Sequence, residues 1–328
     1  MEAIRDIERI ENMLKIGHYL VMTRINFNGY RVYIQTEPEF RYYSGLTGAL
    51  DKSKFKGDPD EKRLKGWREN FIDNFGQKNA DNYLELTGEF GTLLHMALVT
   101  IKNKGKINWK EESELATEYF VSAYKKKRLE PDLKVINSMV YDYNKHVASL
   151  MQFVYDCVDQ IFAIETIAKC EELKIATPID MFCSCRQTPK GKHEKTTINI
   201  KTSSQISKHQ LEQVAFEMVM WNQTYPDEMA VNTAILRTKD WKEDKAPTYE
   251  YKYMNAEEAG GLFKKVYPRL LLCLNSDATY YPNPTSRSFT GETKPGEMPE
   301  IICRTIQQEW ELLKTEPEVI FDTTENNT

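Results

Sequence analysis

IATPIDMFCSCRQTPKGKHEKTTINIKTSS, residues 175–204, is the stretch of the 328-residue chain that decides its fold. It contains two β-favouring runs, 179–187 and 196–202, which are joined by the polar turn segment 188–192. Two such runs on either side of a turn that contains Pro and Gly are typical of a β-hairpin. We therefore expect an antiparallel pair of strands here.

The expected hairpin brings an aspartate, an asparagine and a lysine together. Side chains alternate between the faces of a strand, so Asp180 lies on one face of the first strand, while Asn199 and Lys201 share a face of the second. An Asp followed on the next strand by an acidic residue, any residue and Lys is the arrangement of metal-dependent phosphodiesterases. The carboxylates hold Mg²⁺ or Mn²⁺ against the phosphate, and the lysine assists the attacking water. Ordinary surface hairpins carry the same residue types, so this short pattern needs support from the rest of the chain.

Composition limits the class of protein. The chain is 41% hydrophobic, enough to bury the core of one elaborated domain or of two. It has no run of about 18 apolar residues and no secretory leader pattern, so we expect a cytoplasmic protein without a membrane span. Six cysteines suit a reducing compartment. The net charge of −5 argues against a wholly basic nucleic-acid binder, so DNA contact is expected to be local, at Lys190, Lys192 and Lys195 in the hairpin turn.

Periodic apolar residues predict several helices around the hairpin. His95 falls within the helix expected at 77–103. An isolated histidine on such an apolar helix is either a core residue or a metal ligand. Residues 109–170 are expected to form a long helical region of two or three helices. Ser204 or Ser207 is expected to begin the helix that follows the hairpin. The expected helices are 1–24, 62–75, 77–103, 208–222, 256–274 and 299–314, and the further strands are 30–35, 233–238 and 249–253.

Six short motifs follow one another within roughly residues 40–240: YYSGLTGAL, LKGWRENFIDNFG, GEFGTLLHMAL, CEELKIATPIDMFC, INIKTS and LEQVAFEM. In this order they resemble the RecB-like exonucleases of the PD-(D/E)XK nuclease superfamily. The phage-type and mitochondrial-genome-maintenance-type enzymes are the most similar, and the CRISPR-associated RecB-type exonucleases are more distant.

The resemblance implies a role for individual residues. His95, Asp180, Asn199 and the backbone carbonyl of Ile200 would be metal ligands, with residue 199 acting as a ligand in an active form. Lys201 would assist the nucleophilic water. Glu212 aligns with the glutamine of the family's last motif, and Gln213 takes that place after a shift of one residue.

The resemblance also implies the architecture. We expect an α/β fold of the PD-(D/E)XK restriction-endonuclease-like type, in which a central mixed sheet is flanked by helices. Residues 1–85 would form an N-terminal helical and entry region and residues 86–255 the nuclease core, with a helical insertion at about 105–160. Residues 256–328 would form a C-terminal helical extension.

The implied function is metal-dependent exonuclease hydrolysis of DNA, with Mg²⁺ or Mn²⁺, in recombination, repair or phage DNA processing. The setting would be the cytoplasm of a bacterial or phage-infected cell, with a recombination or replication complex as a possible protein partner. No iron–sulfur cluster is expected, because no cysteine precedes residue 157.

Asn199 departs from the family pattern, which has Asp or Glu at this position. An amide oxygen binds Mg²⁺ more weakly than a carboxylate does. Three explanations stay open: an introduced Asp-to-Asn exchange, a natural pseudonuclease that binds DNA or acts in assembly without cleavage, or a carboxylate supplied from elsewhere. For the third, the sequence offers Glu194 on the hairpin and Glu165 on the preceding helix.

Overall fold

A computed structural model describes residues 22–27, 30–53, 77–126, 131–187, 191–203, 205–238 and 245–276. Within these residues the protein is an α/β fold with one mixed sheet of eight strands. The helices expected at 62–75 and 299–314, residues 1–21 of the one expected at 1–24, and Lys190 lie outside the described residues. The described end of the helix expected at 1–24 is wrong, because residues 23 and 24 belong to a strand. The expectation of a helical region over 1–85 is also wrong at residues 23–27, 30–35 and 41–45, which are strands rich in β-favouring residues.

The strands follow the order β1-β2-β3-β5-β6-β7-β8, and β4 pairs with β5 outside this path. Strands β3 and β5 are parallel, as are β6 and β7, and the other neighbouring pairs are antiparallel. The bounds are β1 Thr23–Phe27, β2 Tyr30–Gln35, β3 Arg41–Gly45, β4 Val158–Cys170, β5 Ile175–Arg186, β6 His193–Lys201, β7 Asn232–Thr238 and β8 Tyr249–Asn255. The strands predicted at 30–35, 233–238 and 249–253 are confirmed as β2, β7 and β8.

The hairpin predicted from residues 175–204 is confirmed. Strands β5 and β6 pair antiparallel, with Met181 opposite Ile198 and Arg186 opposite His193. Nine of the twelve residues of β5 are buried, as in a strand covered on both faces. The hairpin therefore lies at the centre of the sheet.

The sheet opens beside β5. Strand β4 pairs with one edge of β5 along nearly its whole length, from Ile175 to Cys185. Because a strand has only two edges, β3 and β6 must share the other one. Strand β3 pairs there with Ile175 and Ala176, whereas β6 pairs only from Met181 onward. Residues 177–180 therefore lie in a fork between β3 and β6, where β6 leaves β5 and continues beside β7.

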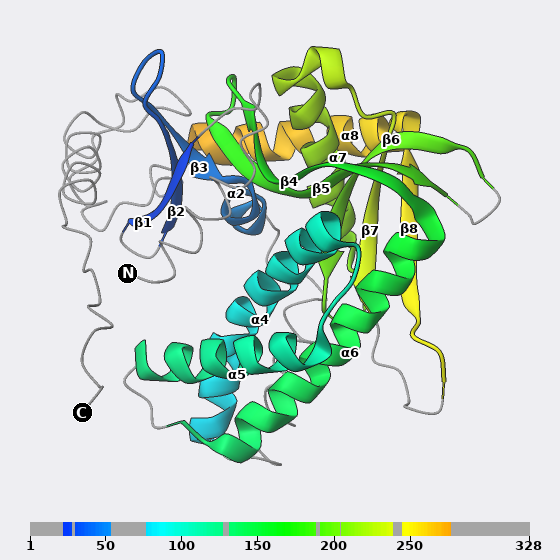
Figure 1. The fold of residues 1–328 in the computed structure, drawn as a ribbon. Helices are drawn as coiled ribbons and strands as arrows, with labels where there is room; N and C mark the ends of the chain where they lie inside the picture. Colours follow the sequence, from blue (N-terminus) through cyan, green and yellow to red (C-terminus); the bar gives the residue numbers. More distant parts are fainter. Residues whose placement is uncertain are drawn as a thin grey trace.

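Helices cover both faces of the sheet (Figure 1). Helices α2, α7 and α8 contribute to the apolar core on one face, which includes Phe182 and Trp221. Helices α4, α5 and α6 contribute to the core on the other face, which includes Met181 and Ile198. The bounds are α2 Leu46–Lys52, α4 Gln77–Lys104, α5 Trp109–Lys126, α6 Leu133–Cys157, α7 Lys208–Thr224 and α8 Ala256–Ser276.

The helical prediction for residues 109–170 is wrong at its C-terminal end. Helices α5 and α6 form as expected, but residues 158–170 are strand β4, which follows α6 without a loop. Isoleucine, valine and threonine recur in this segment, and their branched side chains favour a packed strand over a helix. Glu165 therefore lies on a strand that pairs with β5, and not on a helix.

Helix α7 begins where a capping residue predicts it. The Ser207 side chain accepts a hydrogen bond from the backbone N–H of Gln210, and the Gln210 side chain accepts one from the Ser207 backbone N–H. This reciprocal capping box satisfies two N–H groups that the first turn of a helix leaves unpaired. None of the described helices is long and apolar enough to cross a membrane.

We expect Phe182→Ala to lower the free energy of unfolding by about 3–5 kcal/mol, the usual effect of removing a buried aromatic ring. The Phe182 ring is fully buried, and its centroid lies 4.3 Å from that of Trp221 and 5.4 Å from that of Phe162. Urea unfolding measures the change. Tyr155→Ala is the control, because Tyr155 is 84% exposed and its loss should change stability by less than about 0.5 kcal/mol. Equal effects of the two substitutions would contradict this assignment of the core.

Candidate metal centre

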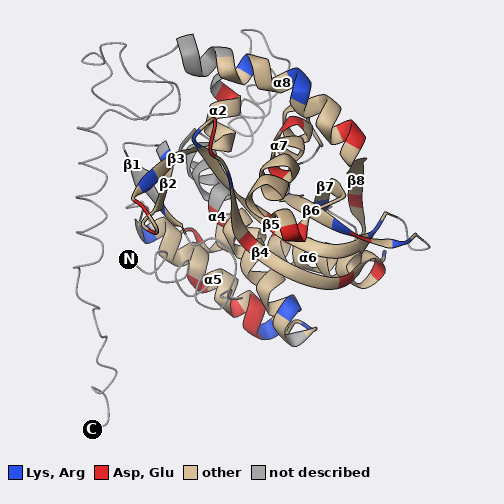
Figure 2. Ribbon diagram, turned by 90° about the horizontal axis from the view of Figure 1, so that it is seen from above, with Lys and Arg blue, Asp and Glu red and all other residues tan. Residues whose placement is uncertain are grey.

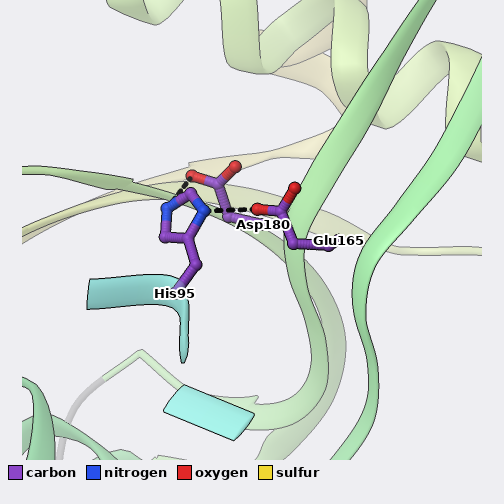
Figure 3. Close-up of side chains that lie close together, drawn as sticks. All are labelled: His95, Glu165 and Asp180. Carbon is purple, nitrogen blue, oxygen red and sulfur yellow. Dashed lines mark ion pairs between the residues drawn. The ribbon is translucent and has the colours of Figure 1, made fainter. Parts of the chain in front are cut away.

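Three side chains that can bind a metal converge at the fork in the sheet (Figure 3). His95 comes from helix α4, Glu165 from strand β4 and Asp180 from strand β5. One ligand atom from each lies within 4.8 Å of the other two. His95 Nδ1 contacts Glu165 Oε1, and His95 Nε2 lies 3.6 Å from Asp180 Oδ2. Of the described residues, only these three form such a group.

Glu165 adopts an unusual backbone conformation. Its neighbours Ile164 and Thr166 pair with Met181 and Ile179, so Glu165 lies opposite Asp180 across the β4–β5 ladder. Its φ angle is 50°, in the left-handed region that a non-glycine residue rarely occupies in a strand. Such a conformation costs about 1–3 kcal/mol and is often found at functional sites. Here it accompanies the contact between the Glu165 carboxylate and His95.

Asp180 is held in place by a hydrogen bond at the point where the sheet opens. It is buried, and its Oδ2 atom accepts a hydrogen bond of 2.7 Å from the backbone N–H of Ile200. The side chain of Asp180 thus pairs with a β6 N–H at the point where β6 separates from β5. This bond fixes one carboxylate oxygen against the strand that carries Asn199 and Lys201.

The charges of the three groups depend on one another. Burial acts to lower the pKa of His95, but the carboxylates of Glu165 and Asp180 outweigh it and raise this pKa to about 9. Burial acts to raise the pKa of Glu165, but its neighbour His95, with Arg24 and Arg31, brings this pKa below its ordinary value. Burial raises the pKa of Asp180, and the charge of Glu165 adds to the effect. Without a metal, His95 is therefore cationic at neutral pH.

This donor set fits a divalent cation. Carboxylate oxygens suit Mg²⁺ and Mn²⁺, while an imidazole suits transition metals better than it suits Mg²⁺. His95, Glu165 and Asp180 would hold the ion. Its binding would displace the extra proton of cationic His95, because an imidazole binds a metal in its neutral form. A neighbouring buried acceptor, Asn199 Oδ1, has no hydrogen-bond partner among the described residues. Buried acceptors are normally paired, and a cation or an ordered water would satisfy this one.

Asn199 faces helix α7. It is 2% exposed, and its Nδ2 donates to both carboxylate oxygens of Glu217, at 3.0 and 3.1 Å. Gln213 Nε2 donates to Glu217 Oε1 at 2.7 Å. Burial and the charge of Asp180 raise the pKa of Glu217 to about 8. Sequence reasoning missed Glu217, although its spacing of four residues from Gln213 places both on one face of the helix.

The structure brings together most of the residues chosen from the sequence. Lys201, at the end of β6, is close enough for its charge to influence the pKa of His95, Asp180 and Glu217. Gln213 belongs to the same network through Glu217. Glu212 instead contacts Arg269 of α8, with a distance of 2.8 Å between Oε2 and the guanidinium. Of the two alignments of α7, the one that uses Gln213 is the one that faces the site.

The lysines of the hairpin turn lie at the other end of β6. Lys192 is exposed just before the strand, and Lys195 contacts Glu228. Since a strand rises about 3.3 Å per residue, these side chains begin more than 10 Å along the strand from Asn199. Glu194, the other carboxylate considered for the metal, accepts a hydrogen bond of 2.7 Å from Asn232 at that distant end. Glu165 is therefore the alternative carboxylate that reaches the group.

Two arginines that sequence reasoning missed lie closer to the metal-binding group. Arg24 on β1 is opposite Tyr33 on β2, and Arg31 is two residues from Tyr33, so both arginines share one face of the β1–β2 hairpin. Their charges help to lower the pKa of Glu165. Elsewhere on the described elements, basic and acidic residues are interspersed (Figure 2).

No model of a known protein family matches the chain, and the search of curated proteins also finds no match. A functional conclusion therefore has to come from the site itself.

We expect Glu217→Gln to stabilise the metal-free protein by an amount that grows from about pH 5 to pH 8. The folded protein keeps the Glu217 proton up to about pH 8, whereas the unfolded chain releases it near 4.5. Between these values the folded state binds more protons, so the native free energy of unfolding falls as pH rises, by at most about 1.4 kcal/mol per pH unit. Glutamine removes this dependence.

Urea unfolding at a series of pH values, with EDTA present, measures the difference between the two proteins. Glu114→Gln controls for a general change of charge, because Glu114 is exposed on α5. Parallel pH profiles for the native and Glu217→Gln proteins would contradict a raised pKa.

Proposed function

We propose that the protein is a divalent-metal-dependent nuclease that hydrolyses phosphodiester bonds in DNA. The observation that carries the proposal is the convergence of His95, Glu165 and Asp180 beside Lys201 at the fork in the sheet. Metal ligands next to a lysine are the groups that phosphodiester hydrolysis needs. The central hairpin within a mixed sheet supports the further proposal that the core is of the PD-(D/E)XK type. The preference for free DNA ends rests on the sequence resemblance to RecB-like exonucleases.

Each residue has a distinct part in this proposal. His95, Glu165 and Asp180 hold the ion, which supplies an activated water and charge stabilisation at the phosphate when bound. The hydrogen bond from the Ile200 N–H orients the Asp180 carboxylate. Lys201 offsets the negative charge that develops on the phosphate and orients the attacking water. The ring of His95 suits Mn²⁺ better than Mg²⁺, so we expect Mn²⁺ to bind more tightly.

We expect Asp180→Asn and Lys201→Met each to lower the rate of DNA cleavage with Mn²⁺ at least about 100-fold, because each removes a group that acts on the reacting phosphate. Degradation of end-labelled single-stranded and duplex DNA measures the rate. Asp180→Asn should also abolish the rise in melting temperature that Mn²⁺ causes in the native protein, while Lys201→Met should keep it. Lys110→Met is the control, because Lys110 is 85% exposed on α5.

The second candidate function is a DNA-binding or assembly protein that does not cleave. Asn199 favours it, because a carboxylate is the stronger ligand at that position. The two functions differ in one result. A native protein that binds Mn²⁺ and DNA but leaves both labelled substrates intact is the non-cleaving protein.

The sugar-phosphate backbone of the substrate is proposed to contact Arg24 and Arg31. The two side chains share a face of the β1–β2 hairpin, and their charges reach Glu165. Phosphates near the metal would otherwise meet the negative charge of Glu165 and Asp180. Arginines at this position provide the local basic surface that an acidic protein needs for DNA contact.

We expect Arg24→Ala with Arg31→Ala to weaken binding of single-stranded DNA and to reduce its dependence on salt. Each lost phosphate contact should lower the slope of log affinity against log salt by roughly 0.7. Fluorescence anisotropy with EDTA present measures binding without cleavage. The charge-matched control is Lys110→Ala with Lys134→Ala, two exposed lysines on α5 and α6. An unchanged slope in the arginine variant would remove these residues from the DNA contact.

A further inference from the structure

Three polar side chains beside the metal-binding group form a closely bonded set. Asn199 Nδ2 donates to both oxygens of Glu217, at 3.0 and 3.1 Å, and Gln213 Nε2 donates to one of them at 2.7 Å. Asn199 is 2% exposed, Glu217 1% and Gln213 6%. The set adjoins the metal-binding group directly, because the residue after Asn199 provides the N–H that binds Asp180.

Packing alone does not account for a carboxylate in this place. A buried carboxylate is costly unless a cation neutralises it, and two amide donors supply hydrogen bonds but no charge. A glutamine at 217 would have the same shape without the cost. Lys201 is the nearby cation, but its charge also acts on Asp180 and His95. Without a metal, cationic His95 and Lys201 balance Glu165 and Asp180, which leaves no cation for an ionised Glu217. A divalent ion together with Lys201 would balance all three carboxylates.

The orientation of the Asn199 amide leaves a buried acceptor that a cation would satisfy. With Nδ2 committed to Glu217, Oδ1 is left buried and without a hydrogen-bond partner among the described residues. When Glu217 is ionised, as it would be beside a bound cation, the alternative orientation would turn Oδ1 toward the carboxylate oxygens and lose both hydrogen bonds. An ion next to Asn199 satisfies this oxygen and the charge of Glu217 together.

We propose that Glu217, from helix α7, supplies the carboxylate that strand β6 lacks at position 199. Asn199 holds Glu217 in place and directs its own Oδ1 toward the cation. This inference rests on the proposed metal site and adds a fourth protein group to it. Three carboxylates then balance the divalent ion and Lys201.

The proposal also explains why residue 199 is an amide. An aspartate there would place its carboxylate about 3 Å from that of Glu217, where two negative charges repel strongly. Asparagine and glutamate therefore form a matched pair, with one amide and one carboxylate. The reverse pair, with aspartate on β6 and glutamine on α7, keeps the same number of charges and the same hydrogen bond.

The test is the affinity for Mn²⁺ alone, measured by isothermal titration calorimetry without DNA. We expect Glu217→Gln to weaken binding roughly 10–100-fold, the range for groups that support a metal site. Asn199→Asp combined with Glu217→Gln should restore the affinity to within about threefold, because it restores the carboxylate. Glu194→Gln is the matched control, since Glu194 also accepts a hydrogen bond from an asparagine but lies at the far end of β6.

A second measurement does not depend on Glu217→Gln folding. With EDTA present and above pH 8, where Glu217 is ionised, Asn199→Asp alone should melt at a lower temperature than the native protein, because two carboxylates then meet. The doubly substituted protein should recover the native melting temperature. Equal melting temperatures for the native and Asn199→Asp proteins would overturn the matched pair.

The outcomes separate this inference from the proposed function. If the native protein and Glu217→Gln bind Mn²⁺ with the same affinity, Glu217 is not part of the site, and the proposed function still stands. Native protein that does not bind Mn²⁺ overturns both. Loss in Glu217→Gln, recovery in the double variant and no change in Glu194→Gln support the inference.

Discussion

The site depends on the contact of His95 with Glu165 and Asp180 at the place where β5 and β6 separate. In a regular sheet the edge of β5 at residue 180 would be covered by the next strand. Here β6 turns away, and the Asp180 carboxylate takes over one of its N–H groups. The opening admits a side chain from α4 on one face and places Asn199 against α7 on the other. Charged groups from both helical layers therefore meet at one point.

The sequence predicts part of the candidate site at the fork in the sheet, where β6 leaves β5. Strand alternation and the polar turn predict the β5–β6 hairpin, and with it Asp180, Asn199 and Lys201. These signals are local, so a short window of sequence contains them. The local pattern places Glu165 on a helix, because Ala, Glu and Lys interrupt the branched residues of this segment and hide the strand pattern. Its role requires the long-range pairing with β5 and a backbone conformation that no local pattern specifies.

Two further features of the site cannot be predicted from local sequence patterns: which residues of α7 face the site, and which arginines lie near it. Glu212, Gln213 and Glu217 lie on one helix, and only its rotation decides which of them faces the sheet. That rotation is fixed by packing, since the Phe216 ring contacts Phe263 of α8 and Glu212 pairs with Arg269. Arg24 and Arg31 precede the β5–β6 hairpin by more than 140 residues in the sequence, so only the folded sheet places them near Glu165.

The direct passage of α6 into β4 couples the helical layer to the site. Cys157 ends the helix and Val158 begins the strand, so no loop absorbs a change in the angle between them. The hydroxyl of Tyr143 on α6 donates its proton to Glu112, and its oxygen lies 3.2 Å from the carbonyl oxygen of Leu93, two residues before His95. The backbone therefore joins α6 to the strand of Glu165, and Tyr143 joins it to the helix of His95. The helical layer thereby fixes the spacing of two side chains of the candidate metal centre.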